Sequence, residues 1–319
     1  MKDIVFDPPT DFQFAPADFV PFKDRELCEK LRQISGPDLG THWNPDFRIK
    51  VMLNPHPVLI ATLFARIKES DEQNKPFTAI LGNPEPETYI PLAELINYHR
   101  VSCRNVNLFA MDEWADQDGN IAPETYKAGF AHSMLKYFVY QVDPDLRMPI
   151  DHVYYPTNKN IADYSKLIAE VGHGGADLCS SSPGWTGHMA FIDPIDDFMT
   201  ETMDEYLEQE ARIVALHPLT IAQNSLHGVF GQSGYVADVP PKAATIGPVD
   251  VKNSRERIEI HALQTSGTFS SWQRMTSRLV LHGPVSPLIP SSMLQLMKTQ
   301  VYVSNEIAAP FDCWETTGY

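Results

Sequence analysis

The strongest constraint on the fold is an alternation, from Arg48 onward, of short apolar runs of strand length with longer stretches of helical periodicity. The apolar runs predict strands at residues 49–53, 77–81, 106–110, 176–179, 212–216, 244–246, 258–263 and 301–303. The stretches between them predict helices at residues 57–68, 87–98, 123–140, 161–171, 268–282 and 291–298. Such βα units build a mostly parallel sheet flanked by helices, so we predict a Rossmann-like α/β domain over residues 48–319.

Residues 1–47 differ in composition and are predicted to form an N-terminal arm. They are rich in Pro, Phe and Asp around residues 12–16, with one helix-like piece at residues 25–33. Aromatic side chains favour a surface against which they can be buried, so we expect the arm to lie over the larger body. An arm of this kind can also contribute contacts in a homo-oligomer.

Composition excludes several classes of partner. The chain has 319 residues and a formal net charge of −16, whereas nucleic acids and anionic membranes attract proteins through clustered Lys and Arg. No run reaches the roughly 18 uncharged apolar residues of a membrane helix, and Pro8 and Pro9 interrupt the N-terminus before a signal peptide could form. We therefore expect a cytoplasmic protein with no nucleic-acid or membrane partner.

Metal and disulfide sites are not predicted. The four cysteines are scattered without a C-x-x-C spacing, and the eleven histidines show neither H-x-H nor H-E-x-x-H. We therefore expect no metal and no cofactor.

Candidate functional residues follow two predicted strands, where the carboxyl edge of a parallel sheet places its ligand crevice. Asp112 and Glu113 follow strand 106–110, and adjacent carboxylates there can serve as general base and anchor, or simply as caps and turn residues. His188 comes after strand 176–179 and directly after Gly187. Its imidazole can transfer protons near neutral pH, with Asp193 orienting it, although a loop histidine bonded to backbone has the same pattern.

These stretches resemble the glucosamine-6-phosphate deaminase/isomerase family, which is related in fold to 6-phosphogluconolactonase. The family's M-D-E-Y and P-E-S-Y segments are matched by residues 111–114 and 123–126. Its G-x-x-G-H-x-A-F-x-E-P run is matched without gaps by residues 184–194, with Asp193 in place of Glu. Residues 219–220 with 222–225, and then residues 241–247, resemble two later family motifs in the same order, so the resemblance covers about residues 48–300.

The resemblance implies a role for each matched residue. Asp112 is expected to be the base that moves a proton between C1 and C2 of the open sugar, with Glu113 beside it. His188 is expected to open the pyranose ring by protonating the ring oxygen, with Asp193 orienting it. Because Asp is one methylene shorter than Glu, we expect this pairing to need a shift of about 1.5 Å or a bridging water.

The departures from the family concern its phosphate site. A phosphate loop of the type G-x-P-T-G-G-T-P is replaced by residues 82–89, which read G-N-P-E-P-E-T-Y. Proline removes an amide donor, and Glu85 and Glu87 oppose a dianion. Leu226 replaces a phosphate-binding Arg, the corresponding Lys falls near Gln273 or Arg274, and Thr186 replaces an Asp two residues before His188. We therefore predict that the family's phosphate site is not used.

Together these observations predict an aldose–ketose isomerase or deaminase-like enzyme acting on a sugar, either an amino sugar or a sugar phosphate. The alternatives are a non-catalytic sugar-binding or regulatory member of the same family, and a lactonase. Trp185 can stack on a sugar or pack under its loop, and Lys127 can meet an anionic group or be solvated. The expected substrate-binding residues are Gly82, Glu85, Glu87, Thr88, Lys127, Gly184, Trp185, Thr186, Gly187 and Arg274.

Overall fold

The computed structural model describes residues 13–82, 84–263 and 271–310. The strands in these ranges are β1 (Phe47–Met52), β2 (Phe77–Leu81), β3 (Val106–Ala110), β4 (Asp112–Ala115), β5 (Val153–Tyr154), β6 (Leu178–Ser181), β7 (Arg212–Ala215), β8 (Lys242–Thr245), β9 (Glu256–His261) and β10 (Thr299–Ser304). The α-helices are α1 (Arg25–Arg32), α2 (His56–Gln73), α3 (Pro86–His99), α4 (Phe130–Tyr137), α5 (Tyr164–Val171), α6 (Met203–Leu207), α7 (Pro218–Asn224), α8 (Pro248–Lys252), α9 (Gln273–His282) and α10 (Asn305–Ala308).

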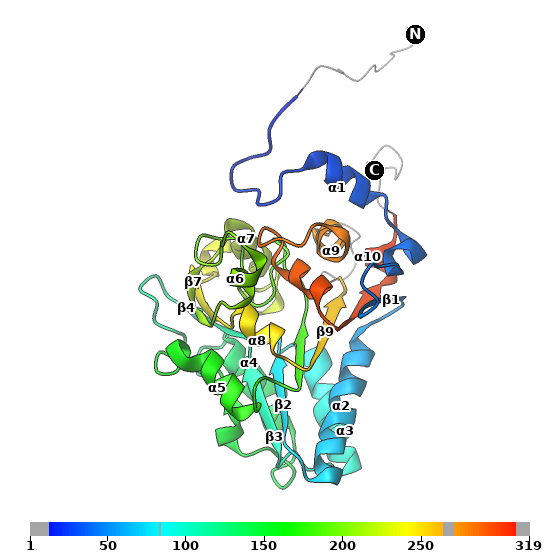
Figure 1. The fold of residues 1–319 in the computed structure, drawn as a ribbon. Helices are drawn as coiled ribbons and strands as arrows, with labels where there is room; N and C mark the ends of the chain where they lie inside the picture. The colour runs from blue at the N-terminus through cyan, green and yellow to red at the C-terminus, as the bar shows by residue number, and fades with distance from the viewer. Residues whose placement is uncertain (1–12, 83, 264–270, 311–319) are drawn as a thin grey trace, which may run out of the picture.

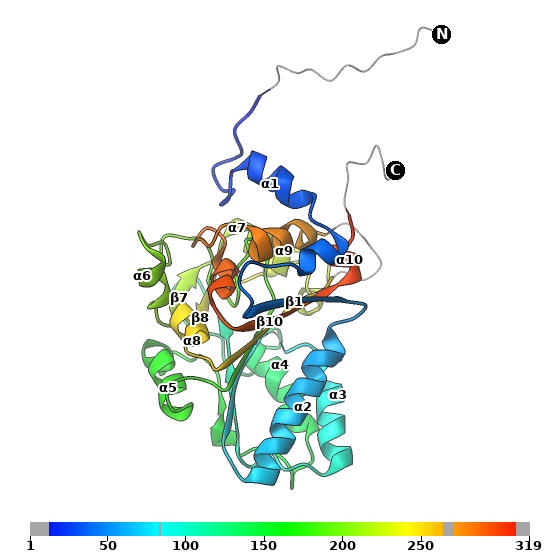
Figure 2. The same ribbon diagram turned by 45° about the vertical axis from the view of Figure 1, so that its right-hand side comes forward.

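The main sheet has seven parallel strands in the order β1-β10-β9-β6-β2-β3-β5, which confirms the predicted α/β fold (Figures 1 and 2). Successive side chains of a strand point to opposite faces of the sheet and so join different hydrophobic clusters. In β2, Ala79 and Leu81 belong to one cluster and Ile80 belongs to the other. One cluster packs under α2, α3 and α4, and the other under α5 and α9. Helices therefore cover both faces, and the carboxyl edge is left for the site.

A second sheet of three antiparallel strands, in the order β4-β8-β7, was not expected. The predicted strands at 212–216 and 244–246 belong to it and not to the parallel sheet, so their placement was wrong. The chain turns at Met111, where its carbonyl accepts the N–H of Ile246 at 2.9 Å, and continues as β4. Asp112 and Glu113 thus begin a short buried strand rather than lie in a turn.

Three predicted helices differ from the observed ones. Residues 123–129 form successive turns, and α4 begins only after Gly129. The expected helix at 291–298 is a 3-10 helix at Pro290–Leu296. Residues 268–270 of another expected helix lie outside the described residues, and α9 begins at Gln273.

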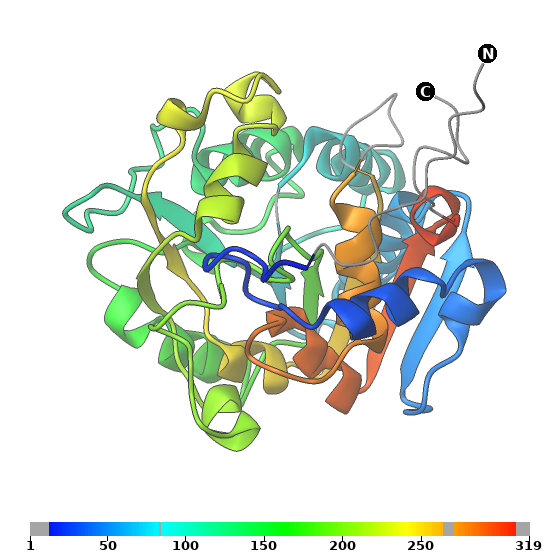
Figure 3. The same cartoon turned by 90° about the horizontal axis from the view of Figure 1, so that it is seen from above.

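Seen from above, the arm crosses over the larger body (Figure 3), and two of its backbone carbonyls accept hydrogen bonds from that body. Side-chain nitrogens of the body bind these carbonyls: His217 Nε2 binds that of Phe19 at 2.9 Å, and Arg278 Nε binds that of Ile34 at 2.7 Å. The aromatic residues of the arm are not all buried, since Phe14 and Phe19 are each 55% exposed. Polar contacts to backbone therefore contribute to the arm's attachment beside the burial expected from its composition.

No helix within the described residues is long and apolar enough to cross a membrane. Across the same ranges, no group of three or more His, Cys, Asp or Glu side chains could hold a metal ion. Cys28, Cys103 and Cys179 are free thiols, and Cys313 lies outside the described residues.

Candidate active site

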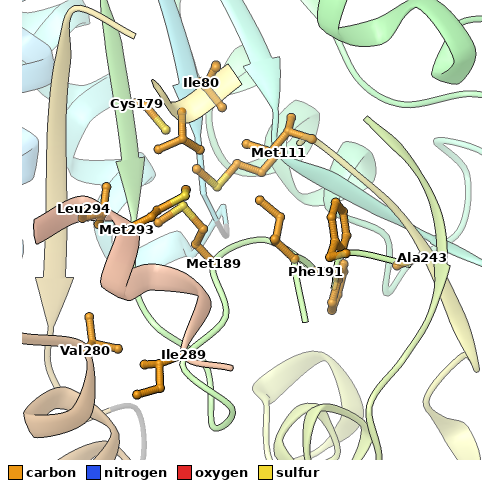
Figure 4. Packing of buried hydrophobic residues seen from close by; sticks show 14 of the residues in the cluster. Ile80, Met111, Cys179, Met189, Phe191, Ala243, Val280, Ile289, Met293 and Leu294 are labelled. Atoms are coloured by element: carbon orange, nitrogen blue, oxygen red, sulfur yellow. The ribbon is translucent and has the colours of Figure 1, made fainter. Parts of the chain in front are cut away.

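The segment that follows β6 folds into a tight turn that presents His188. The Gly184 N–H donates to the His188 carbonyl at 2.8 Å, and Gly187 adopts a left-handed φ of +82°, which glycine tolerates without strain. Met189 and Phe191, just beyond, are buried in the core beside Met111 and anchor the turn (Figure 4). Residue 188 is therefore held from both sides.

Asp193 holds the His188 ring by a direct hydrogen bond. Its Oδ1 accepts from His188 Nδ1 at 2.8 Å and from the hydroxyls of Thr186 and Thr220 at 2.7 and 2.8 Å. Its Oδ2 accepts from the His217 N–H at 3.2 Å. The shorter Asp thus reaches the imidazole directly, without a bridging water. Thr186, which stands where the family has an Asp, donates to Asp193.

This network lowers the pKa of Asp193 and fixes which ring nitrogen of His188 faces it. Burial raises the pKa of Asp193, but the charge of His188 and the hydrogen bonds from His188, Thr186 and Thr220 outweigh burial and lower it below its ordinary value. An ionised Asp193 fixes the proton of a neutral imidazole on Nδ1, so Nε2 is the atom left for a ligand. Nε2 lies against Gly184, where an added Cβ would be only 1.9 Å away.

Asp112 and Glu113 have different surroundings, although they are adjacent. Burial first, and the nearby Glu113 charge second, raise the pKa of Asp112 well above its ordinary value. The Glu113 carboxylate instead accepts the N–H groups of Trp114, Phe130 and Ala131 at 2.9, 3.2 and 2.8 Å. Glu113 is fully buried at the start of α4, where burial raises its pKa to about 7 against those three hydrogen bonds. Its side chain therefore binds the N-terminus of this helix.

One pocket joins Asp112 to His188. Its empty volume is about 500 Å³, counted together with the open solvent at its mouth. The described residues that line it are Gly82, Met111, Asp112, Phe130, Ser182, Pro183, Gly184, His188, Ala190, Phe191, Gln223, Asn224 and His227. Two residues that can exchange protons thus face one cavity, although they follow different strands.

Other predicted site residues lie elsewhere. Trp185 stacks on Trp272, with ring centroids 6.0 Å apart and planes 15° apart, so its ring packs beside the loop. Lys127 is exposed in the turn before α4. Arg274 donates to the carbonyls of Ala309 and Pro310 near the C-terminus. These three side chains do not line the pocket among the residues the structure describes.

The segment that stands in place of the family's phosphate loop, residues 82–89, leads into α3 and borders a second cavity. Pro86, the first residue of α3, has no N–H, and the N–H groups of Thr88 and Tyr89 donate to the Glu85 carbonyl at 3.2 and 3.1 Å. Burial and the neighbouring Glu87 raise the pKa of Glu85 to about 7. Glu85 and Glu87 both face this cavity, together with Leu226.

Sequence reasoning missed several residues of the site. Thr220 of α7 binds Asp193, and Gln223 of the same helix accepts the Trp185 N–H at 2.6 Å. Both lie in the stretch whose motif matches the family, which was a usable signal. His217 carried no motif, because its role depends on its backbone N–H and on its position before α7.

No known protein-family model matches the chain. Among individual proteins, it is 30% identical over 232 residues to a glucosamine-6-phosphate deaminase of Rhodopirellula baltica, covering 72% of this chain and 80% of that protein. It is 26% identical over 249 residues to a glucosamine-6-phosphate deaminase of Caenorhabditis elegans, covering 76% and 82%. This chain belongs to the glucosamine-6-phosphate deaminase family.

Solved structures agree on the fold of this family member. A monomeric glucosamine-6-phosphate deaminase superposes with a TM-score of 0.63 at 18% identity, over 82% of this chain and 98% of that one. A 6-phosphogluconolactonase of Trypanosoma cruzi superposes with a TM-score of 0.57 at 16% identity, over 85% and 100%. The resemblance inferred from motifs is confirmed, and the chain is an enzyme of this family.

Proposed function

We propose that this enzyme opens the ring of an aldose or amino sugar and moves a proton between C1 and C2. The observation that carries the proposal is the single pocket lined by both Asp112 and His188, with His188 fixed by Asp193. No metal or organic cofactor is required, because both proton transfers use side chains of the chain itself.

The proposal gives each proton transfer to one side chain. His188 in its protonated form donates from Nε2 to the ring oxygen, and ionised Asp193 stabilises the imidazolium that donates. The Asp112 carboxylate then removes the C2 proton of the open sugar and returns it at C1 through an enediol or enolamine. Glu113 does not touch the sugar in this scheme, since it holds α4, whose first residue Phe130 lines the pocket.

The proposal includes a changed phosphate site. Phosphate binding at a helix N-terminus needs free amides and positive charge. Here Pro86 lacks an amide, two carboxylates face the cavity, and Leu226 replaces an Arg. Charge-assisted hydrogen bonds are worth roughly 1.5–3 kcal/mol each, so these changes lead us to expect millimolar or weaker affinity for glucosamine 6-phosphate. Calorimetric titration with glucosamine 6-phosphate and with glucosamine tests this point. Micromolar binding of the phosphorylated sugar alone would contradict it.

Solvent deuterium exchange at C2 of glucosamine tests the reaction. The Asp112→Asn variant keeps the shape of the side chain but loses its basicity, so exchange should fall by roughly 10²–10⁴-fold. The matched control is Asp118→Asn, because Asp118 is an exposed carboxylate just after β4, the strand that begins at Asp112. This variant should exchange like the wild type. Exchange by Asp112→Asn at the wild-type rate would refute the assigned base.

Measurements of sugar binding and of lactone hydrolysis, made beside the exchange assay, separate the alternatives. Saturable sugar binding without any exchange by the wild type would favour a non-catalytic sugar-binding member. Hydrolysis of a sugar lactone that depends on His188 but not on Asp112 would favour a lactonase, the activity named for several proteins of similar fold.

A further inference from the structure

A second cavity adjoins the catalytic pocket and is larger. Counted together with the open solvent at its mouth, its empty volume is about 1160 Å³, against about 500 Å³ for the pocket around Asp112 and His188. The two share His227 as a lining residue, and both border the segment that runs from Gly82 into α3. A substrate that fills only the catalytic pocket would leave most of this space to solvent.

The lining of the second cavity combines apolar and hydrogen-bonding groups. Its apolar side chains come from the segment before α3, from the segment after α7 and from the end of β9: Pro84, Pro86, Leu226, Val229 and Leu263. Its polar side chains either accept hydrogen bonds or can both donate and accept them: His56, Glu85, Glu87, Ser133, Tyr137, His227 and Gln232. Neither Lys nor Arg is among the described residues that line it. This surface suits a ligand with hydroxyl or amine donors and apolar C–H faces, and it disfavours an anion.

Geometry decides which end of a substrate lies there. The reacting atoms, C1, C2 and the ring oxygen, must lie between Asp112 and His188. The part of the molecule remote from them extends past His227, the residue common to both cavities. A sugar substituted on O4 or O6 still opens its ring, because neither oxygen takes part in that step.

We propose that the second cavity binds the second sugar unit of a disaccharide whose reducing-end amino sugar occupies the catalytic pocket. A sugar ring carries the hydroxyl donors that Glu85 and Glu87 accept and the C–H faces that Leu226 and Tyr137 can cover. This inference rests on the proposed function, because the reducing end must be the unit that reacts.

Calorimetric titration with glucosamine and with the β-1,4-linked disaccharide of glucosamine tests the inference. The disaccharide should bind the full-length enzyme at least about tenfold more tightly. Leu226→Trp places an indole ring in the cavity, where it blocks the position of a second sugar, and should reduce this ratio of affinities to about one. Leu53→Trp makes the same replacement at a 76% exposed position and should retain the ratio. Val229→Trp, at a 46% exposed position on the cavity, repeats the test if Leu226→Trp does not fold.

Each result has one meaning. Equal affinities for the two sugars, or a ratio that the cavity-filling variants leave unchanged, would overturn the inference. Deuterium exchange at C2 of glucosamine would then still support the proposed function. Failure to bind or exchange either sugar would overturn both.

Discussion

Gly184 is the position where one methyl group should disable the site while leaving the fold intact. A Cβ built there lies 1.9 Å from Nε2, 2.3 Å from Cε1 and 2.4 Å from Cδ2 of His188. Ordinary contacts between heavy atoms begin near 3.5 Å, so the ring must move by roughly 1.5 Å in Gly184→Ala.

The ring cannot move that far and keep its partners. His188 Nδ1 is 2.8 Å from Asp193 Oδ1, and a displacement of this size breaks the hydrogen bond. A misplacement of about 1 Å can cost about 10²-fold in rate, and loss of a general acid about 10²–10⁴-fold. We expect turnover by Gly184→Ala to fall within that range.

The assay is deuterium exchange at C2 of glucosamine, measured beside thermal unfolding. Gly40→Ala is the matched control, because a Cβ there meets only the Ile49 carbonyl at an ordinary 3.6 Å. Gly184→Ala should unfold near the wild-type temperature, since the displaced ring can use the pocket space. Turnover within about threefold of the wild type would refute the reasoning and show that Nε2 takes no part.

Three further predictions follow from the buried ionisable groups. Burial and the charge of Glu113 raise the pKa of Asp112, and only its ionised form is a base. The pH at which kcat/KM falls on the acidic side should therefore lie above the ordinary carboxylate range. Glu113→Gln should move this fall to lower pH in a pH–rate profile. Asp193→Asn removes the charge that stabilises the imidazolium and should lower exchange by about 10²-fold or more, while circular dichroism remains native. Burial raises the pKa of Glu259 to about 8, so as the pH rises from about 4.5 to 8 this carboxyl ionises in the unfolded chain before it does in the folded one. The free energy of unfolding should therefore fall by up to about 1.4 kcal/mol per pH unit over this range. Denaturant titrations of Glu259→Gln should show a free energy of unfolding that depends less on pH.

The periodicity of apolar residues predicted the parallel sheet well, because buried parallel strands read as continuous apolar runs. The residues of β2 and β3 were predicted at their observed bounds. The second sheet escaped prediction because its short strands give the same local signal as parallel ones. The pairings distinguish them: β8 pairs antiparallel with β4, more than a hundred residues away in the chain, and with β7.

The site followed the same division between local and long-range information. His188, Asp193 and Asp112 were predicted from local motifs; Asp112 and His188 line one pocket, and Asp193 binds His188. Trp185 was left open between sugar stacking and packing, and its partner Trp272 comes from another element that no local pattern joins to it. Arg274 was predicted because the resemblance places the family's phosphate-binding Lys near it, but its side chain binds the carbonyls of Ala309 and Pro310.

Glu113 shows how one motif can carry two physical tasks. Successive residues of a strand point to opposite faces, so Asp112 and Glu113 cannot both enter the same pocket from β4. Asp112 faces the pocket, whereas Glu113 lies against Gly129, where an added Cβ would be 3.1 Å from its Oε1. The carboxylate of Glu113 thereby fixes the start of α4 and places Phe130 on the pocket wall, and its charge also raises the pKa of Asp112. The adjacent acids are therefore coupled through structure and charge, although only one of them faces the sugar.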